Sequence, residues 1–225
     1  MLNAPDRSEG CEGVKILLIL SHPNPGSYNH ALAAAVRLAL TKAGHQVVFH
    51  DLHAEGFDPV YGAEEHRSDA GLPPLVASHV EDICSADGLV IVHPNYWNRP
   101  PAMLCGWTDR VLREGRAFRF IPDGRGGARP EGLLRLEFAL VVTTANTPRE
   151  VEVGYYGDPL DQHWRKVVLG LCGVPRIERL SLCPVITSSL EQRAGWLSEV
   201  SSKSVEMAST KPRTDTSGGR GPSRP

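Results

Sequence analysis

The strongest constraint on the fold is the run Val14–Leu20, in which nearly every side chain is apolar. A strand with one face in water alternates polar and apolar residues, whereas this run suits burial on both faces. Such strands belong to parallel sheets that helices cover on both sides. Four more strands are predicted at Gln46–His50, Asp87–His93, Leu136–Thr144 and Arg176–Cys183.

Helices are predicted between these strands. Ser27 is a favourable N-cap for a first helix that ends at Lys42, just before Gly44. The later helices are predicted at Pro74–Ser85, Pro101–Leu112, Pro159–Leu171 and Ser188 to about Ser202, and the segments Leu52–Pro73 and Arg113–Arg135 are predicted to be mostly irregular. This alternation predicts an α/β fold, a doubly wound, five-stranded parallel sheet with helices on both faces.

The 225 residues suit one folded domain with a polar segment at either end. Residues 1–13 are predicted to be a flexible N-terminus, and residues 14–203 to be the domain. From Ser204 to Pro225 the sequence is rich in Ser, Thr, Pro, Gly, Lys and Arg, which predicts a disordered tail.

Charge and cysteine content narrow the class of protein. A net charge of -2 gives no indication of a nucleic-acid or anionic-membrane partner. The apolar runs are far shorter than the ~20 residues that span a bilayer, and the N-terminus lacks the layout of a signal peptide. Five scattered cysteines without a Cys-x-x-Cys pair suit a reducing compartment. We therefore expect a soluble, cytoplasmic protein that neither binds nucleic acid nor inserts into a membrane.

Three loops follow predicted strands at the edge of the sheet where ligands bind. In an open α/β sheet this edge lies beyond the carboxyl ends of the strands, at the point where the strand order reverses. The loops are Ser21–Asn29, His93–Pro101 and Thr143–Pro148, the last continuing to Gly154–Pro159.

The loops differ in the chemistry that they offer. Ser27 and Asn29 stand at a helix N-terminus, which suits a phosphate, although an ordinary turn with Ser27 as N-cap is the alternative. Tyr96 and Trp97 lie between prolines and offer flat faces to a planar ligand, with a packed surface loop as the alternative. The small polar residues of the third loop allow backbone N–H groups to approach the pyrimidine edge of a flavin. Together the three loops predict one binding site.

Other site chemistries find little support in the sequence. The histidines at positions 45, 50, 53, 66 and 79 lie in turns or polar stretches and are predicted to be solvated. No pair of them has metal-ligand spacing beside a carboxylate, so no metal is predicted. The Gly-x-Ser-x-Gly elbow of covalent hydrolases and the Gly-x-Gly-x-x-Gly of dinucleotide-binding folds are both missing.

The segment Pro94–Val111, PNYWNRPPAMLCGWTDRV, resembles the hallmark of the flavodoxin-like NAD(P)H dehydrogenase (quinone) family. Members typically show Pro-x-x-Trp, then Pro-Ala-x-Leu-Lys-Gly-Trp, then Asp-Arg-Val. The likeness extends back to Ser21–Asn29 and forward through Tyr156–Leu160 and Leu171–Val174, covering roughly Val14 to Val200. The family includes mammalian quinone reductases, bacterial modulators of drug activity and ancillary oxidoreductases of potassium-efflux systems.

The resemblance implies a flavoenzyme that reduces quinones or similar aromatic acceptors with NADH or NADPH, by two-electron ping-pong hydride transfer, as a homodimer with two sites at the interface. It implies FMN, with FAD as the alternative. The implied phosphate-end residues are His22, Ser27, Tyr28 and Asn29. The implied ring contacts are Pro94, Asn95, Tyr96, Trp97 and Asn98 on one side, and Thr143, Thr144, Ala145, Asn146 and Thr147 on the other.

Departures from the family pattern fall where the acceptor would bind. Mammalian members carry Gly-Gly where this chain has Ala145-Asn146, and His where it has Tyr156. A catalytic polar group near the flavin would therefore be Tyr156 or Tyr155, and tyrosine cannot become cationic as histidine can. Two other functions remain open at this point: a regulatory flavoprotein attached to a potassium-efflux-type transporter, and a flavodoxin-type electron carrier, although carriers usually have strongly acidic surfaces.

Overall fold

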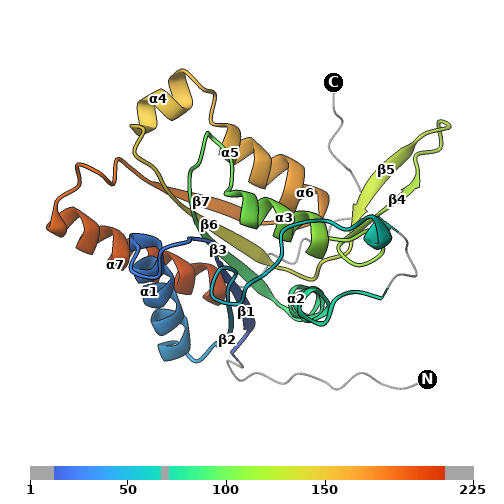
Figure 1. Cartoon of the computed structure of the whole chain (residues 1–225), viewed down its shortest axis with the longest axis horizontal. Coiled ribbons are helices and arrows are strands. Elements are labelled where there is room, and N and C mark those ends of the chain that lie inside the picture. The colour runs from blue at the N-terminus through green and yellow to red at the C-terminus, as the bar shows by residue number, and fades with distance from the viewer. Residues whose placement is uncertain (1–12, 67–70, 211–225) are drawn as a thin grey trace.

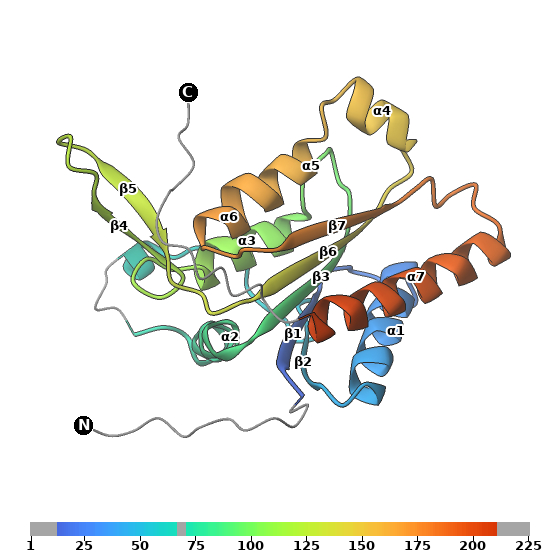
Figure 2. The same cartoon turned by 180° about the vertical axis from the view of Figure 1, so that it is seen from behind.

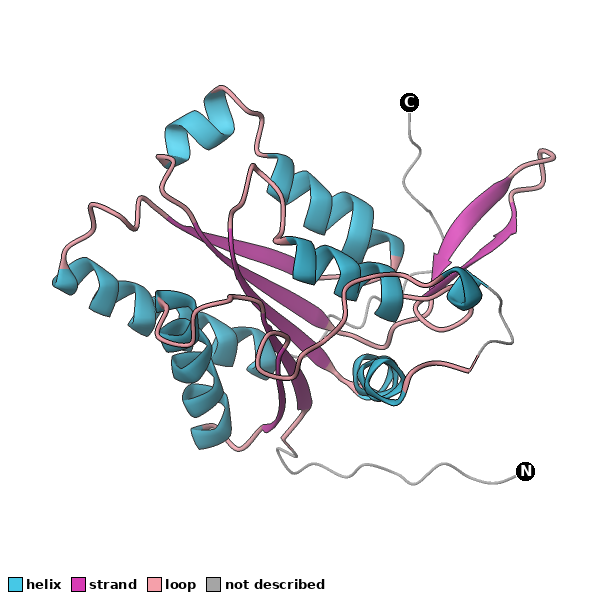
Figure 3. Cartoon of the chain, in the orientation of Figure 1, coloured by secondary structure: helices cyan, strands magenta, loops and turns pink. Residues whose placement is uncertain are grey.

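A computed structural model describes residues 13–66 and 71–210, which form one parallel five-stranded sheet between two layers of helices (Figures 1 and 3). The strands are β1 (Lys15–Leu20), β2 (Gln46–Asp51), β3 (Gly88–Pro94), β6 (Phe138–Thr144) and β7 (Ile177–Leu182). Their order, β2-β1-β3-β6-β7, is that of the flavodoxin-like fold. The chain moves from β1 outward to β2 and then returns to place β3 on the other side of β1, so the order reverses at the ends of β1 and β3.

Helices cover both faces of the sheet (Figure 2). One face is covered by α1 (Tyr28–Lys42) and α7 (Leu190–Ser209), which pack against each other. The other is covered by α2 (Pro74–Ser85), α3 (Ala102–Val111) and a continuous helical stretch made of α5 (Pro159–Asp161), a π-helical segment (Gln162–Val168) and α6 (Leu169–Leu171). Smaller elements are a 3-10 turn (Ala63–His66), the hairpin strands β4 (Phe118–Pro122) and β5 (Ala128–Gly132), and α4 (Arg149–Gly154).

The apolar run that begins the fold is buried on both sides, as the sequence predicts. Ile16, Leu18 and Leu20 pack into the core beneath α1 and α7, whereas Leu17 and Ile19 pack into the core beneath the opposite helices. All five side chains have no exposed surface. Alternation of side chains along one strand therefore supplies both cores.

The core beneath α2, α3 and α5–α6 contains two buried tryptophan–histidine pairs. The indole N–H of Trp107 donates to Nδ1 of His79 at 2.9 Å, and the indole N–H of Trp164 donates to Nε2 of His93 at 3.0 Å. Neither histidine has exposed surface, and burial lowers the pKa of each to about 4. Both are therefore neutral acceptors at neutral pH, and the prediction that His79 is solvated is wrong.

The fold prediction is confirmed in its class and sheet, and it differs from the structure in three places. Arg113–Arg135 contains the antiparallel hairpin β4–β5, which projects from the body of the molecule (Figure 1). A short helix, α4, occupies part of the third loop. The last helix continues past Ser202 to Ser209, with Ser204 and Met207 buried, so residues 204–209 are helical and not part of a disordered tail. The predictions for residues 1–12 and 211–225 lie outside the described residues.

Among the described residues, none of the helices combines the length and the apolar character needed to cross a membrane.

Candidate functional site

The three loops singled out in the sequence meet at the carboxyl edge of β1, β3 and β6, where they enclose a cavity of about 250 Å³. The cavity is lined by His22, Ser27, Tyr28, Asn29, Pro94, Asn95, Tyr96, Thr144, Ala145, Asn146 and Val185. None of these side chains is that of Asp, Glu, Lys or Arg. The site therefore offers neutral hydrogen-bonding groups and aromatic rings.

The first loop places the N-terminus of α1 in the cavity wall. Ser27 is the N-cap, as predicted, and its Oγ accepts from the backbone N–H of His30 at 3.4 Å. The first N–H groups of a helix have no carbonyl partner within it, so they present a partial positive charge to an anion. Asn29 closes the buried end of the cavity, because its amide exchanges hydrogen bonds with Oγ1 of Thr144 at 3.0 and 3.2 Å.

Burial perturbs two titratable groups of this loop. It lowers the pKa of His22, whose Nδ1 accepts from the backbone N–H of Asn24 at 3.1 Å. It raises the pKa of Tyr28, whose hydroxyl donates to the carbonyl of Arg193 at 2.7 Å. Both groups are therefore neutral at neutral pH and fixed in direction by their partners.

The second loop is a tight turn held by reciprocal backbone hydrogen bonds between Tyr96 and Arg99, each 3.1 Å long. Trp97 and Asn98 at its tip have positive φ values of 56°, a backbone region that costs a residue other than glycine roughly 1–2 kcal/mol. Trp97 is 92% exposed. A strained, solvent-facing tryptophan beside a cavity is the arrangement expected where a ligand or a second protein molecule supplies the missing contacts.

Asn95 carries the clearest sign of a missing ligand. Its side-chain N–H groups donate to Oε1 of Glu152 at 2.7 Å and to Oδ1 of Asn98 at 3.3 Å. Its Oδ1 is buried and has no partner among the described residues. A buried carbonyl without a donor costs free energy, so Oδ1 of Asn95 is an acceptor awaiting an N–H group.

Glu152 fixes that orientation from α4. The carboxylate is 2% exposed and also accepts from the hydroxyl of Ser181 at 3.2 Å, with Arg149 at 3.5 Å. Because a carboxylate can only accept, the Asn95 amide must turn its nitrogen toward Glu152 and its oxygen away.

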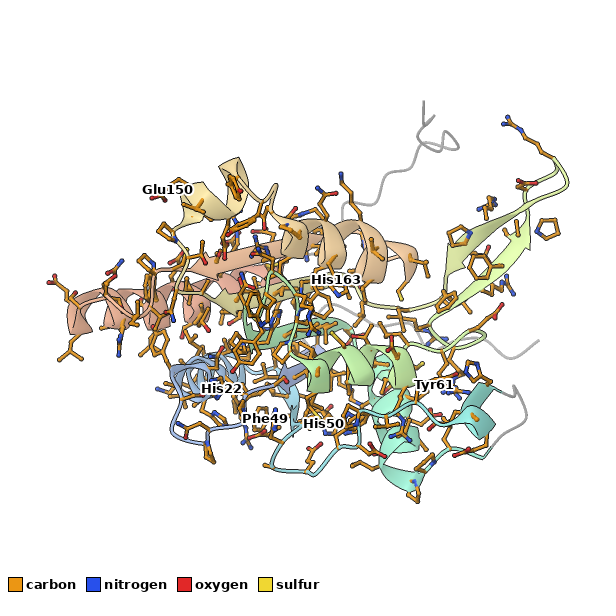
Figure 4. All side chains as sticks on the ribbon, turned by 45° about the horizontal axis from the view of Figure 1, so that its top comes forward. His22, Phe49, His50, Tyr61, Glu150 and His163 are labelled. Atoms are coloured by element: carbon orange, nitrogen blue, oxygen red, sulfur yellow. The ribbon has the colours of Figure 1, made fainter. Side chains whose placement is uncertain are left out.

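An ion-pair network anchors the segment around α4 to the sheet. Asp158 pairs with Arg149 at 2.5 Å and with Arg179, which is 3% exposed and donates to Oγ1 of Thr143 at 2.9 Å. These two arginines hold the pKa of Asp158 below its usual value against the opposing effect of burial. In Figure 4 the labelled Glu150 marks this segment, on the opposite side of the molecule from Tyr61.

The sequence predictions for the site can be compared with this geometry residue by residue. The cavity wall includes all the predicted phosphate-end residues and Pro94, Asn95, Tyr96, Thr144, Ala145 and Asn146 of the predicted ring contacts. Trp97, Asn98, Thr143 and Thr147 do not line it, and Thr143 points away, with its hydroxyl donating to the carbonyl of Leu180 at 3.3 Å.

The two tyrosines of the predicted catalytic position lie outside the cavity wall. Tyr155 and Tyr156 follow α4, are 81% and 47% exposed, and contact each other edge to face at 5.0 Å between ring centroids. Two other residues were missed by sequence reasoning. Val185 joins the wall because its N–H donates to the carbonyl of Ala145 at 2.9 Å, and Glu152 supports Asn95 from a helix that was not predicted.

A second cluster joins His50, Glu55 and His79, with Glu55 2.8 Å from Nδ1 of His50 and 3.0 Å from Nε2 of His79. The cluster has the residue types of a metal site, but its hydrogen bonds differ from those around a metal-binding histidine. Trp107 donates to Nδ1 of His79, so the imidazole proton lies on Nε2, the atom that faces Glu55. A histidine ligand normally donates from its other ring nitrogen, whereas here that nitrogen accepts, so the cluster forms a hydrogen-bond network.

Comparison with known proteins supports the same family that the motif suggested. A family model described as having a flavodoxin-like fold matches residues 14–199. Ribosyldihydronicotinamide dehydrogenase (quinone) from Homo sapiens is 29% identical over 211 residues, covering 82% of this chain and 89% of the relative. The FMN-dependent NADH:quinone oxidoreductase of Pelagibacter ubique is 28% identical over 169 residues, covering 69% of this chain and 81% of the relative.

Among solved structures, Smu.1420 from Streptococcus mutans superposes with a TM-score of 0.74 at 29% sequence identity. The alignment covers 85% of this chain and 99% of that chain. The similarity therefore extends over nearly the whole described domain.

Proposed function

The chain belongs to the flavodoxin-like family, and from that membership we propose that it is an FMN-dependent oxidoreductase. The proposed reaction uses NADH or NADPH to reduce quinones or similar aromatic acceptors. The names of two relatives support it, because one is named a ribosyldihydronicotinamide dehydrogenase (quinone) and the other an FMN-dependent NADH:quinone oxidoreductase.

The observation that carries the proposal is the meeting of three sequence-distant loops in one cavity at the switch point of the sheet. If the three loops only connected strands to helices, a helix N-terminus, an aromatic turn and a small polar turn would not be expected to surround one cavity. Open α/β sheets bind their ligands at this position.

The residues fit FMN at both of its ends. The N-terminus of α1 with Ser27 suits a phosphate, and Oδ1 of Asn95 is a buried acceptor that suits the N–H group of an isoalloxazine ring. Tyr96 contributes an aromatic face to the wall between them. When bound, FMN supplies the redox chemistry, a two-electron transfer from NAD(P)H to the acceptor. FAD is the alternative flavin, since Asn24 and Pro25, in the loop that leads to Ser27, are exposed.

The protein's own part is to bind and orient. Glu152 orients the Asn95 amide, and the Asp158 ion pairs hold the segment that carries Tyr155 and Tyr156. We propose these tyrosines as the polar groups that meet the acceptor. Their exposure is compatible with a role at the open side of the site.

We further propose a homodimer in the cytoplasm. An apolar hollow of about 470 Å³ lies between α3 and the π-helical segment, with Leu112, Phe118 and Leu171 in its wall, and Val167 beside it is 59% exposed. A second copy of the chain covering this hollow would bury that surface. The four described cysteines are free thiols, which suits a reducing compartment.

The experiment is direct. The purified protein should be yellow, with flavin absorbance that bleaches anaerobically on addition of NADH or NADPH, and chromatography of the released flavin should identify FMN. Rates across a panel of quinones, nitroaromatics and azo dyes would define the acceptor, and gel filtration with light scattering would give the oligomeric state. A colourless protein that takes up neither FMN nor FAD would refute the proposal.

A further inference from the structure

Behind Ser27 lies a chain of hydrogen bonds that no cavity-lining role explains. Oγ of Ser27 is 2.8 Å from Nδ1 of His30, and Nε2 of His30 is 2.9 Å from Oδ2 of Asp51. The histidine and aspartate side chains are only 19% and 15% exposed. The chain therefore runs from β2, through the first turn of α1, to a hydroxyl in the cavity wall.

The partners of Asp51 determine where the protons lie. Its other oxygen, Oδ1, accepts from the backbone N–H groups of His53 and Ala54, each at 3.2 Å. The carboxylate is thus an acceptor on both oxygens, and the proton between it and His30 belongs to Nε2 of His30. A neutral His30 then has a bare Nδ1, so the Ser27 hydroxyl must donate to it.

That direction is wrong for an anion. With its hydrogen turned toward His30 and one lone pair accepting from the backbone N–H of His30, Oγ of Ser27 has only its second lone pair to present to the cavity, and a lone pair repels phosphate oxygens. If His30 takes up a proton, Nδ1 donates to Oγ instead, and the hydroxyl hydrogen is released toward the cavity. The imidazolium also brings a positive charge one contact from the anion, while Asp51 balances that charge from the other side.

We propose that the Asp51–His30–Ser27 chain couples uptake of one proton to recognition of a phosphate monoester, so that this protein distinguishes FMN from riboflavin more strongly as the pH falls toward neutrality. The inference rests on the proposed FMN site. His30 and Asp51 act through Ser27 and are positioning residues.

Other ionisable groups face His30 and could confound a simple pH profile. His22 meets it edge to face from the first loop at 6.2 Å, and Arg37 lies on α1 in the wall of the same neighbouring hollow as His30 and Asp51. His53 follows Asp51 in the chain. The test must therefore assign the proton to His30 and not merely detect it.

Calorimetric titration of the full-length apoprotein at pH 8, in buffers of different ionisation enthalpy, counts protons taken up on binding. At that pH a phosphate monoester is already a dianion, because its second pKa is about 6, and an ordinary histidine is neutral. Binding of FMN should be accompanied by uptake of about one proton, and binding of riboflavin by none. In fluorescence titrations the Kd for FMN should rise by up to about tenfold per pH unit above neutrality, and the Kd for riboflavin should stay constant.

Three variants assign the proton. His30→Gln should bind FMN without proton uptake, whereas the matched control His66→Gln, on the 3-10 turn beside Tyr61, should behave as the wild type. In Asp51→Asn, the backbone N–H groups of His53 and Ala54 hold the new amide oxygen, so its NH2 must donate to His30. Neutral His30 would then donate to Ser27 permanently, and FMN binding should become independent of pH while remaining intact.

The outcomes separate this inference from the proposed function. FMN binding without proton uptake, equal uptake with riboflavin, or uptake that persists in His30→Gln would overturn the coupling and leave the FMN enzyme standing. Absence of FMN binding at every pH would overturn both. Should Asp51→Asn fail to fold, the comparison of FMN with riboflavin in the wild type and His30→Gln still decides the matter.

Discussion

Acidification should destabilise this protein well before its carboxylates titrate, because of the two buried tryptophan–histidine pairs. In each pair an indole N–H donates to the bare nitrogen of a histidine, Trp107 to His79 and Trp164 to His93. The remaining nitrogen of His79 faces Glu55, and that of His93 donates to the carbonyl of Pro94 at 2.8 Å. A second proton would point at the indole donor, so protonation breaks the hydrogen bond in addition to placing a charge in the core.

The size of the effect follows from the pKa values. Each histidine has a pKa of about 4 in the folded protein, against about 6.5 in the unfolded chain. Between these values the unfolded state binds more protons, so stability is present above pH 6.5 and is lost as the pH falls toward 4. From pH 7 to pH 5 each histidine should cost about 2 kcal/mol, and the pair about 4 kcal/mol. Since a domain is usually stable by about 5–15 kcal/mol, the loss is large.

Urea unfolding of the apoprotein at pH 7 and pH 5, followed by circular dichroism, measures this loss without a contribution from bound flavin. His79→Gln keeps an acceptor for Trp107 and a donor for Glu55 but cannot titrate, so it should remove about half of the pH dependence. The substitution His66→Gln replaces an exposed histidine and should leave the pH dependence of the unfolding free energy unchanged. An unfolding free energy equal at the two pH values would refute the reasoning that these imidazoles are held neutral in the core.

Four further substitutions test the site and the fold. Asn95→Ala should weaken FMN and riboflavin alike by about 2- to 13-fold, because it removes a neutral hydrogen bond of about 0.5–1.5 kcal/mol, whereas Ser27→Ala should weaken FMN alone; fluorescence titration with both flavins separates the two ends. Gly106→Ala would place a Cβ 2.1 Å from the backbone oxygen of Pro59, so urea unfolding should show a loss of about 1–3 kcal/mol. Trp97→Gly should raise the stability of the apoprotein by up to about 1 kcal/mol in the same assay, by relieving the positive φ of 56°, and yet weaken flavin retention; lower stability would contradict the inferred strain.

The sheet could be predicted from sequence because its strands are buried on both faces, which leaves an unbroken apolar run as a signature. The hairpin β4–β5 could not, since Arg113–Arg135 is rich in Gly, Arg and Pro, and its strands expose most of their side chains. The extension of α7 was hidden by its serines. Ser201 and Ser204 satisfy their hydroxyls on carbonyls one turn back, so a composition that suggests disorder is accommodated in a helix.

His79 shows a signal that was available in the sequence. Val76, His79, Val80 and Ile83 recur at the three- and four-residue spacing of one helical face, and all four are buried. The presence of a histidine on that face suggested a polar stretch, but the spacing predicts an inward position. What the sequence could not supply was its partner, because Trp107 lies 28 residues away on another helix.

In the site, too, some residues can be predicted from a local motif, whereas others are brought together only by the fold. The loops that form the cavity wall are local in sequence and were predicted, and none of their wall residues is an acid or a base of fixed charge. The charges lie behind the wall: Glu152 contacts Asn95 directly, and Asp51 acts on Ser27 through His30. Because a carboxylate only accepts, Glu152 turns the carbonyl of Asn95 toward the ligand. Asp51 holds the proton of neutral His30 on Nε2, so Ser27 presents a donor to the ligand only once His30 takes up a second proton. Ring and phosphate differ in that same respect, one offering N–H and the other oxygen, so the two carboxylates give the cavity a direction that its uncharged wall does not have.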